Sequence, residues 1–503
     1  MSEALPGVEL QLPAAPLRDA AAVILVRPGT IATQEVFWVR RGEQLRFSGG
    51  FHAFTGGKVD AADATTPIAA CPPGEEALRV AAIRETFEEA GVLLARGAER
   101  VTAARLHALR EELLAGGSFA ALLAREGLLP DASLLAPAGR WVTPPISPVR
   151  FDARFYLARL PAGQEASIIP GELSGGGFVR PADGLAAWER GEVLLHPPNL
   201  HVLSTLAGHG LEAALPRLRT PPFVGDDHIV TRIEFQRGVH LVALRTPTLP
   251  PAQHTNCFVV GTGELAVIDP GSPYPQEQEL LAAKLEGLVA EGRTVRAVLL
   301  THHHGDHVGG ALDVARRFSV PVWASAATAA RFPGAVGCLE DGKLLTFDGP
   351  LPVRLTCVLT EGHAPGHLCF EEERSRAIFV GDMVAAGSTI VIDPPEGDMG
   401  VYLSSLQRLL DRFPGTLYPA HGYPIPDGPA KLREYVTHRE ARLSQLEEAL
   451  ADGVRLLPAL VERVYAETPP FLHPIAERSA LASLLELARR GKARETAGGW
   501  APA

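Results

Sequence analysis

Apolar and polar residues along the first 215 positions are spaced as in a sheet covered by helices. Short apolar runs rich in branched side chains are typical of strands, whereas apolar residues spaced three and four apart are typical of helices. Gly91 lies near the end of one such helical stretch, where glycine commonly closes a helix. By these patterns we expect strands at 20–26, 36–41 and 150–160, and helices at 76–94 and 101–127.

From about residue 229 short strands alternate with helices, a pattern that favours a layered α/β architecture. After residue 431 the pattern is almost wholly helical and ends in a short turn and one further strand. A proline-rich stretch at 216–228 has no periodicity and is typical of a loop. We therefore expect a multidomain α/β protein with domains at 1–215, 229–430 and 431–503, and a linker at 216–228.

The composition of the 503 residues is that of a globular protein, with 46% hydrophobic residues, 21% charged residues and a net charge of −11. This excludes charge-dominated disorder, and an acidic chain is a poor non-specific nucleic-acid binder. The five cysteines form no CxxC pair, which favours free thiols in a reducing compartment. The sequence has no apolar run of about 18 residues and no basic, apolar leader, so we expect a cytoplasmic protein without a membrane partner.

Three glutamates on the helix expected at 76–94 are the first candidate site. Glu85, Glu88 and Glu89 stand at positions i, i+3 and i+4, so they project from one face. Carboxylates packed in this way repel one another unless a divalent cation neutralises them, and oxygen ligands alone suit Mg²⁺ or Mn²⁺. A solvated acidic helix face is the alternative for these three residues. Arg84 is placed to hold a carboxylate such as Glu76.

The longer series, in which seven residues separate Glu76 from Arg84-Glu85-x-x-Glu88-Glu89-x-Gly91, resembles the Nudix box of Nudix hydrolases. An insertion separates it from FTGGKVD, and this insertion resembles the coenzyme A diphosphatase-like branch. The resemblance implies a Nudix α/β/α sandwich that hydrolyses a small nucleotide-type diphosphate with Mg²⁺ or Mn²⁺. It implies catalytic and metal-binding roles for Glu85, Glu88 and Glu89, a catalytic role for Arg84, and substrate or cofactor binding by Gly56, Gly57 and Glu76.

A histidine-rich turn at 298–310 is the second candidate site. It follows an apolar strand, so its polar side chains stand at a carboxyl end, where α/β proteins build sites. Imidazole and carboxylate together in one tight turn are typical zinc ligands. Other histidines and aspartates follow later in comparable places. The candidates are His302, His304, Asp306 and His307 in the turn, and Asp269, His363, His367, Asp382 and His421 elsewhere.

This series resembles the metallo-β-lactamase superfamily over about residues 235–430, which implies an αββα sandwich holding two Zn²⁺ ions. Two such ions share a water and lower its pKa to about 7. His363 is expected to pack nearby without binding metal, and His303 to be structural or exposed. The resemblance implies one metal on His302, His304 and His367, a second on Asp306, His307 and His421, a bridging Asp382, an orienting Asp269, and a catalytic role for Asp306.

The segment HTNCFVVG and the segments after Asp382 and His421 resemble the β-lactamase-like endoribonuclease branch of this superfamily. Residues 431–503 fit the small winged-helix-like domain of that branch. The sequence thus predicts a bifunctional metallohydrolase whose zinc site cleaves RNA phosphodiesters. Hydrolysis of a thioester such as acyl-CoA, or of another carbonyl substrate, is an alternative for this site. A regulatory, nucleotide-binding first domain is a second alternative. The tail has 11 Lys and Arg against 10 Asp and Glu, and its most basic stretch, 488–494, is typical of a solvated helix end.

Overall fold

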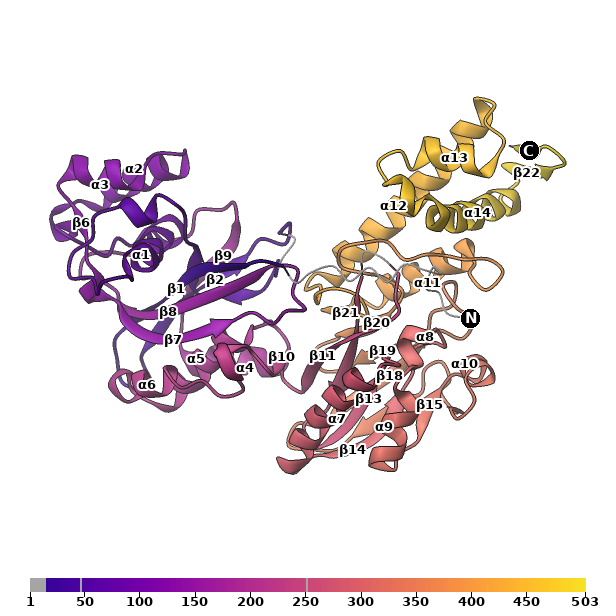
Figure 1. The fold of residues 1–503 in the computed structure, drawn as a ribbon, viewed down its shortest axis with the longest axis horizontal. Helices are drawn as coiled ribbons and strands as arrows, with labels where there is room; N and C mark the ends of the chain where they lie inside the picture. Colours follow the sequence, from indigo (N-terminus) through magenta and orange to yellow (C-terminus); the bar gives the residue numbers. More distant parts are fainter. Residues whose placement is uncertain (1–14, 46–47, 250–251) are drawn as a thin grey trace. The chain divides into compact units, whose positions relative to one another are not determined.

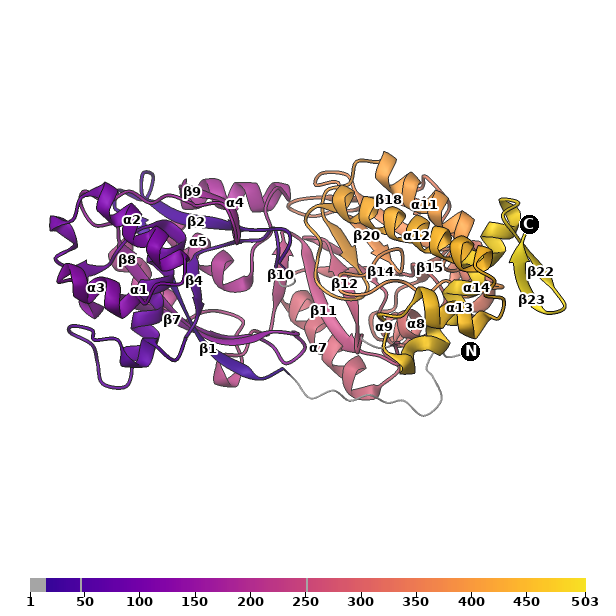
Figure 2. The same ribbon diagram turned by 90° about the horizontal axis from the view of Figure 1, so that it is seen from above.

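The computed structural model describes residues 15–45, 48–249 and 252–503. The chain divides into two compact units, with the boundary between Arg237 and Gly238 (Figures 1 and 2). The stretch predicted as a linker, 216–228, belongs to the first unit. Its first residues form the end of a helix whose Leu218 is fully buried, and Arg219 donates a hydrogen bond to the carbonyl of Pro137 at 2.8 Å. In the described part of the chain no helix is long and apolar enough to span a membrane.

The first unit is a seven-stranded sheet with helices on both faces. Its central strand β1 runs parallel to β8 and antiparallel to β2 and β4. The strands follow the order β3-β2-β1-β8-β7, while β4 pairs with β1 and β9 with β2. The sheet comprises β1 (Leu17–Arg27), β2 (Glu35–Arg41), β3 (His52–Ala53), β4 (Thr55–Lys58), β7 (Ala136–Val142), β8 (Arg150–Arg159) and β9 (Leu173–Val179).

Alternate side chains of β1 enter two different cores, as expected for a strand buried on both faces. Val23 and Leu25 pack in the core with helix α1, whereas Ile24 and Val26 pack in the core with α5. This is the predicted α/β/α sandwich. One side holds α1 (Glu76–Ala90), α2 (Ala103–Leu114), α3 (Phe119–Glu126) and the hairpin of β5 (Ala95–Arg96) with β6 (Leu129–Pro130); the other holds α4 (Pro181–Arg190), α5 (Pro197–Gly208) and α6 (Leu211–Leu218), before β10 (Ile233–Gln236).

The second unit contains two sheets packed face to face. Ile268 and Leu299 of one sheet share a core with Leu355 and Phe370 of the other, while the outer faces are covered by helices. This is the predicted αββα sandwich. The first sheet includes β11 (Val239–Arg245), β12 (His254–Val260), β13 (Glu264–Ile268), β14 (Thr294–Leu299), β15 (Val322–Ala324) and β16 (Val336–Gly337); the second comprises β17 (Leu344–Phe347), β18 (Val353–Leu359), β19 (Leu368–Glu372), β20 (Ile378–Gly381) and β21 (Leu417–Pro419).

The helices of this sandwich are followed by a small C-terminal bundle with its own apolar core, in which Leu446, Leu460 and Leu484 are fully buried. A two-stranded hairpin follows the last helix, where the sequence predicts a turn and a single strand. The sandwich carries α7 (Pro275–Ala290), α8 (Gly305–Val308), α9 (Ala311–Phe318), α10 (Ala326–Arg331) and α11 (Met399–Asp411), and the bundle carries α12 (Gly428–Ala451), α13 (Leu457–Val464), α14 (His473–Arg489), β22 (Ala493–Thr496) and β23 (Gly499–Pro502).

Candidate functional site

The glutamates of the first candidate site lie on the last turns of α1, beside strand β4. The main-chain N–H of Gly56 donates to Glu89 at 2.8 Å. A Cβ atom at Gly57 would stand only 2.4 Å from a carboxylate oxygen of Glu85. The absence of a side chain at Gly57 therefore lets the strand approach Glu85 closely.

Arg84 lies among carboxylates, although its main partner differs from the predicted Glu76. Its guanidinium donates two hydrogen bonds to Asp63, at 2.9 and 3.0 Å. It also reaches Glu85 at 2.9 Å and Glu88 at 3.2 Å. Glu76 is eight residues earlier on the same helix, a rise of about 12 Å, whereas the inserted segment brings buried Asp63 alongside. Asp63 could not be predicted as a partner of Arg84, because the inserted segment carries no motif that singles it out.

The surroundings of the three glutamates of α1 disfavour the ionised form of their side chains. Burial, reinforced by neighbouring carboxylates, raises the pKa of Glu85 to about 7 and that of Glu89 to about 8. Burial also raises the pKa of Glu88, against the opposing effect of Arg84. A bound divalent cation would offset this cost, since it favours the ionised carboxylates.

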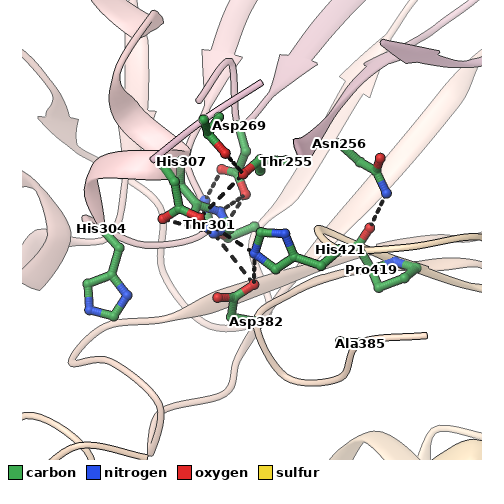
Figure 3. Close-up of polar contacts among 12 residues, drawn as sticks. Thr255, Asn256, Asp269, Thr301, His304, His307, Asp382, Ala385, Pro419 and His421 are labelled. Atoms are coloured by element: carbon green, nitrogen blue, oxygen red, sulfur yellow. Dashed lines mark hydrogen bonds and ion pairs between the residues drawn. The ribbon is translucent and has the colours of Figure 1, made fainter. Parts of the chain in front are cut away.

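The second candidate site gathers side chains from the carboxyl ends of several strands (Figure 3). Asp269 follows β13, and Asp382 follows β20. His302 and His307, in the turn after β14, have no exposed surface. In the described part of the chain, groups of three ligand atoms within 4.8 Å of one another occur only in this unit. The predicted turn thus meets residues up to about 120 positions away in the sequence.

The first ligand group contains His363 in the place predicted for His367. Nδ1 of His304 lies 2.9 Å from Nε2 of His302 and 3.0 Å from Nε2 of His363. His367, by contrast, has neither ring nitrogen in this group. Its Nε2 accepts from the main-chain N–H of Asp382 at 3.2 Å, and its Nδ1 meets the hydroxyl of Thr360 at 3.0 Å. This differs from the prediction, because the chain turns between the two histidines and brings only the first to the group.

The second ligand group consists of Asp306, His307 and His421, as the sequence analysis grouped them. Asp382 stands between the two groups. Its Oδ1 lies 3.5 Å from Nε2 of His307 and 3.4 Å from Nε2 of His421, while its Oδ2 lies 3.6 Å from Nε2 of His363. A carboxylate with one oxygen toward each group is placed to bridge two ions. Figure 3 shows His307, His421 and Asp382 converging.

The outer nitrogens of these imidazoles are fixed by hydrogen bonds. Nδ1 of His307 lies 2.8 Å from Asp269, which also accepts from the main chain of Thr301. Nδ1 of His421 donates to the carbonyl of His254 at 3.0 Å. Asp269 adopts φ of 47°, a conformation that non-glycine residues rarely take and that tends to occur at functional sites.

Two buried polar atoms at the centre of this cluster, Nε2 of His307 and Oδ1 of Asp382, have no hydrogen-bond partner among the described residues. Buried polar atoms are nearly always paired, so their convergence fits a metal ligand set. Burial and neighbouring imidazoles lower the pKa of His302 well below its ordinary value, which keeps it neutral as a ligand must be. Outside the cluster, His303 pairs with Glu396 at 3.1 Å.

Three protein-family models match the chain. They are described as the metallo-beta-lactamase superfamily over residues 250–421, the NUDT19 Nudix domain over residues 65–206, and the beta-lactamase associated winged helix domain over residues 457–500. These matches agree with the three folds described above.

The chain also resembles curated proteins and solved structures. Lactamase-like protein adaB of Aspergillus niger is 36% identical over 39% of this chain, which spans 59% of adaB. Lactamase-like protein vrtG of Penicillium aethiopicum is 32% identical over 52% of this chain and 80% of vrtG. A NUDIX hydrolase from Alicyclobacillus acidocaldarius is 34% identical over 41% of this chain and 99% of its own, with a TM-score of 0.38.

Proposed function

The chain belongs to the metallo-β-lactamase superfamily and also carries a Nudix domain and a winged-helix domain, and from this premise we propose that it is a bifunctional metallohydrolase. Both families are hydrolases. The proposal assigns a Mg²⁺-dependent diphosphatase to the first unit and a dinuclear zinc hydrolase to the second. The observation that carries it is the convergence of imidazoles and aspartates around Nε2 of His307 and Oδ1 of Asp382. These two buried atoms lie 3.5 Å apart and have no hydrogen-bond partner among the described residues.

In the second unit, His302, His304 and His363 would hold one ion, and Asp306, His307 and His421 the other, with Asp382 between them. Bound zinc would supply hydroxide at neutral pH and polarise the oxygen under attack. Asp269 keeps the proton of His307 on Nδ1, so that Nε2 stays free to bind.

We favour a small carbonyl substrate such as an acyl thioester over RNA at this site. RNA binding draws on cations free to meet phosphates, but three of the four cations in the most basic stretch of the tail are ion-paired. Arg489 pairs with Asp398 at 2.7 Å, and Lys492 pairs with Glu447 at 2.8 Å. Arg490 is held by Glu440 at 2.9 Å and by Glu486 at 2.7 Å. These ion pairs support the alternative of a thioester or another carbonyl substrate at the zinc site.

In the first unit, Glu85, Glu88 and Glu89 would bind Mg²⁺ or Mn²⁺ and Arg84 would fix their arrangement. Their raised pKa values and close packing support the proposal that a bound cation compensates the negative charge of these carboxylates. A nucleotide-type diphosphate such as coenzyme A is the substrate class that we propose. An acyl-CoA would then carry both susceptible groups, a thioester for one site and a diphosphate for the other.

The substrate assignment is tested by incubating the full-length protein with an acyl-CoA and, separately, with a single-stranded RNA. We expect free thiol to be released from the thioester in the presence of zinc, and RNA to remain intact at the same enzyme concentration. Cleavage of RNA without thiol release would contradict the choice of a carbonyl substrate and favour the endoribonuclease alternative.

A further inference from the structure

One ligand of the candidate zinc centre is oriented by a loop rather than by a strand. Nδ1 of His363 donates to the carbonyl of Val391 at 2.9 Å. Val391 lies in the segment between β20 and α11, outside any helix or strand. The matching partner of His421 is the carbonyl of His254, which belongs to strand β12. The sheet fixes that carbonyl, whereas the carbonyl of Val391 depends on whatever holds the loop.

The two neighbours of Val391 are held by the C-terminal helices. Arg439 of α12 donates from Nη2 to the carbonyl of Ile390. On the other side, the main-chain N–H of Ile392 donates to the hydroxyl of Ser479 on α14 at 3.1 Å. Both peptide groups that flank Val391 are therefore tied to helices beyond the sandwich. These ties set the direction in which its carbonyl points.

Earlier in the same loop a third side chain of these helices makes comparable contacts. The hydroxyl of Tyr435 on α12 accepts from the main-chain N–H of Ala385 at 2.8 Å and donates to the carbonyl of Ser388, 2.6 Å away. Tyr435 is almost fully buried. The loop is thus attached to α12 along its length, and to α14 next to Val391.

Arg439 is notable because its charge is buried without an acidic partner. The residue is 3% exposed, and the hydrogen bond of its guanidinium goes to a main-chain carbonyl, with no ion pair among the described residues. The guanidinium lies over the ring of Tyr402, 5.4 Å from its centroid. Placing a cation away from water is costly unless hydrogen bonds or rings compensate it. The hydrogen bond to the carbonyl of Ile390 and the contact with the ring of Tyr402 compensate this cost.

We propose that Arg439 and Ser479 are positioning residues of the zinc centre, acting through Val391 on His363. The proposal rests on the proposed function, since it takes His363 as a ligand. While the carbonyl of Val391 is held, Nδ1 of His363 keeps its proton and Nε2 faces the metal group. Losing the partner of a ligand's outer nitrogen typically lowers metal affinity by roughly 10–100-fold. The C-terminal helices would thus be part of the zinc site's support.

The test measures zinc affinity of the full-length protein by competition with a chromophoric chelator. Ser479→Ala removes the hydroxyl that holds Ile392. Ser483→Ala is the matched control, because Ser483 is also buried on α14 but donates to the carbonyl of Ser479, within the helix. We expect Ser479→Ala to lower the affinity for one of the two zinc ions by roughly 10–100-fold. Ser483→Ala should bind both zinc ions with the affinity of the unmodified protein.

A second pair of variants keeps the test independent of α14. Arg439→Met removes the donor to Ile390, and Arg442→Met alters an arginine one turn further along α12 that pairs with Glu467 instead. Of these two variants, we expect only Arg439→Met to lower the affinity for zinc. Unchanged affinity in both Ser479→Ala and Arg439→Met, with folding verified by circular dichroism, would overturn the proposal. Equal losses in Ser483→Ala and Ser479→Ala would also overturn it, since general helix packing would then be responsible. Fewer than two zinc ions on the unmodified protein would instead overturn the dinuclear centre itself.

Discussion

His363 and His367 have the same side chain and stand four residues apart, yet their ring nitrogens have different partners. His367 is enclosed by Thr360 and the main chain of Asp382, which use both of its nitrogens. His363 donates through Nδ1 to a carbonyl and leaves Nε2 beside His304. Only the second arrangement turns a ring nitrogen toward another imidazole of the candidate ligand set.

This difference predicts opposite outcomes for two substitutions. We expect His363→Ala to retain about one zinc ion per chain, because one ligand group loses a member. We expect His367→Asn to retain two, because an amide can still hydrogen-bond to Thr360. Elemental analysis of the folded, zinc-saturated proteins measures this directly. The reverse result, with two ions in His363→Ala and one in His367→Asn, would restore the ligand set expected from the sequence.

A pair of histidines in the first unit predicts how its stability depends on pH. Burial, with the nearby charge of Arg40, lowers the pKa of His52 from 6.5 to about 4, and burial with Arg41 lowers that of His196 to about 3. Between pH 6.5 and 4 the unfolded state therefore binds protons that the folded state does not. Folding stability should fall with decreasing pH in this window, by on the order of 1 kcal/mol per histidine per pH unit.

Hydrogen exchange of β1 at pH 7 and pH 5 measures this effect in the first unit alone. His196→Gln should lessen the difference between the two pH values, because one titrating group is gone. His107→Gln, on the exposed surface of α2, is the control and should leave the difference unchanged. Equal pH dependence in His196→Gln and the unmodified protein would contradict the prediction.

Single residues show where sequence reasoning succeeds and where it stops. His302, His304, Asp306 and His307 could be found because one turn carries all four, so their proximity is local. The choice between His363 and His367 could not, because it depends on which nitrogen faces the cluster. Asp63 could not either, since an inserted segment brings it to Arg84 through tertiary packing.

At the scale of the element, the end of α1 is held by an arginine from the next helix. Arg110 of α2 is 2% exposed. Its Nε and Nη2 donate to the carbonyls of Glu88 and Glu89 at 2.8 and 2.7 Å. The last carbonyls of a helix have no partner within it, so this side chain satisfies two of them. Arg110 thereby also fixes the backbone that carries two site glutamates.

Arg110→Met should therefore destabilise the first unit by roughly 3 kcal/mol, because two buried carbonyls lose a charged donor. Diphosphatase activity should fall with it, since Glu88 and Glu89 lose their support. Arg105→Met, on the exposed side of the same helix, should change stability far less. The free energy of unfolding of both variants can be measured by chemical denaturation, with hydrogen exchange of the α1 amides as the probe of the first unit. Similar losses for the two variants would show that the carbonyl contacts contribute little.

The element boundaries predicted from the sequence hold where the apolar pattern is strong, as in β1 and α1. The stretch at 216–228 has the composition of a linker, because proline and glycine interrupt its pattern. In the structure α6 continues through Pro216 to Leu218, and Val230 further on packs in the core of the first unit. Which core receives such a segment depends on tertiary contacts that its own sequence does not encode.

At the scale of the whole molecule, each compact unit contains a full set of candidate site residues. All residues proposed for the diphosphatase lie within 15–237, and all residues proposed as zinc ligands lie within 238–503. The hard carboxylate site suits Mg²⁺, whereas the imidazole-rich site suits zinc and should hold it far more tightly. The central claim is therefore that one chain carries two separable hydrolytic activities.

The most direct test incubates one acyl-CoA with the full-length protein and separates the products of thioester and diphosphate cleavage. Glu88→Gln should lower diphosphate cleavage at least about 100-fold and leave thioester hydrolysis unchanged, whereas Asp306→Asn should do the reverse. Glu111→Gln, an exposed glutamate of α2, is the control and should affect neither. If either Glu88→Gln or Asp306→Asn abolished both activities together, or if neither changed either activity, the account of two separate metal sites would be contradicted.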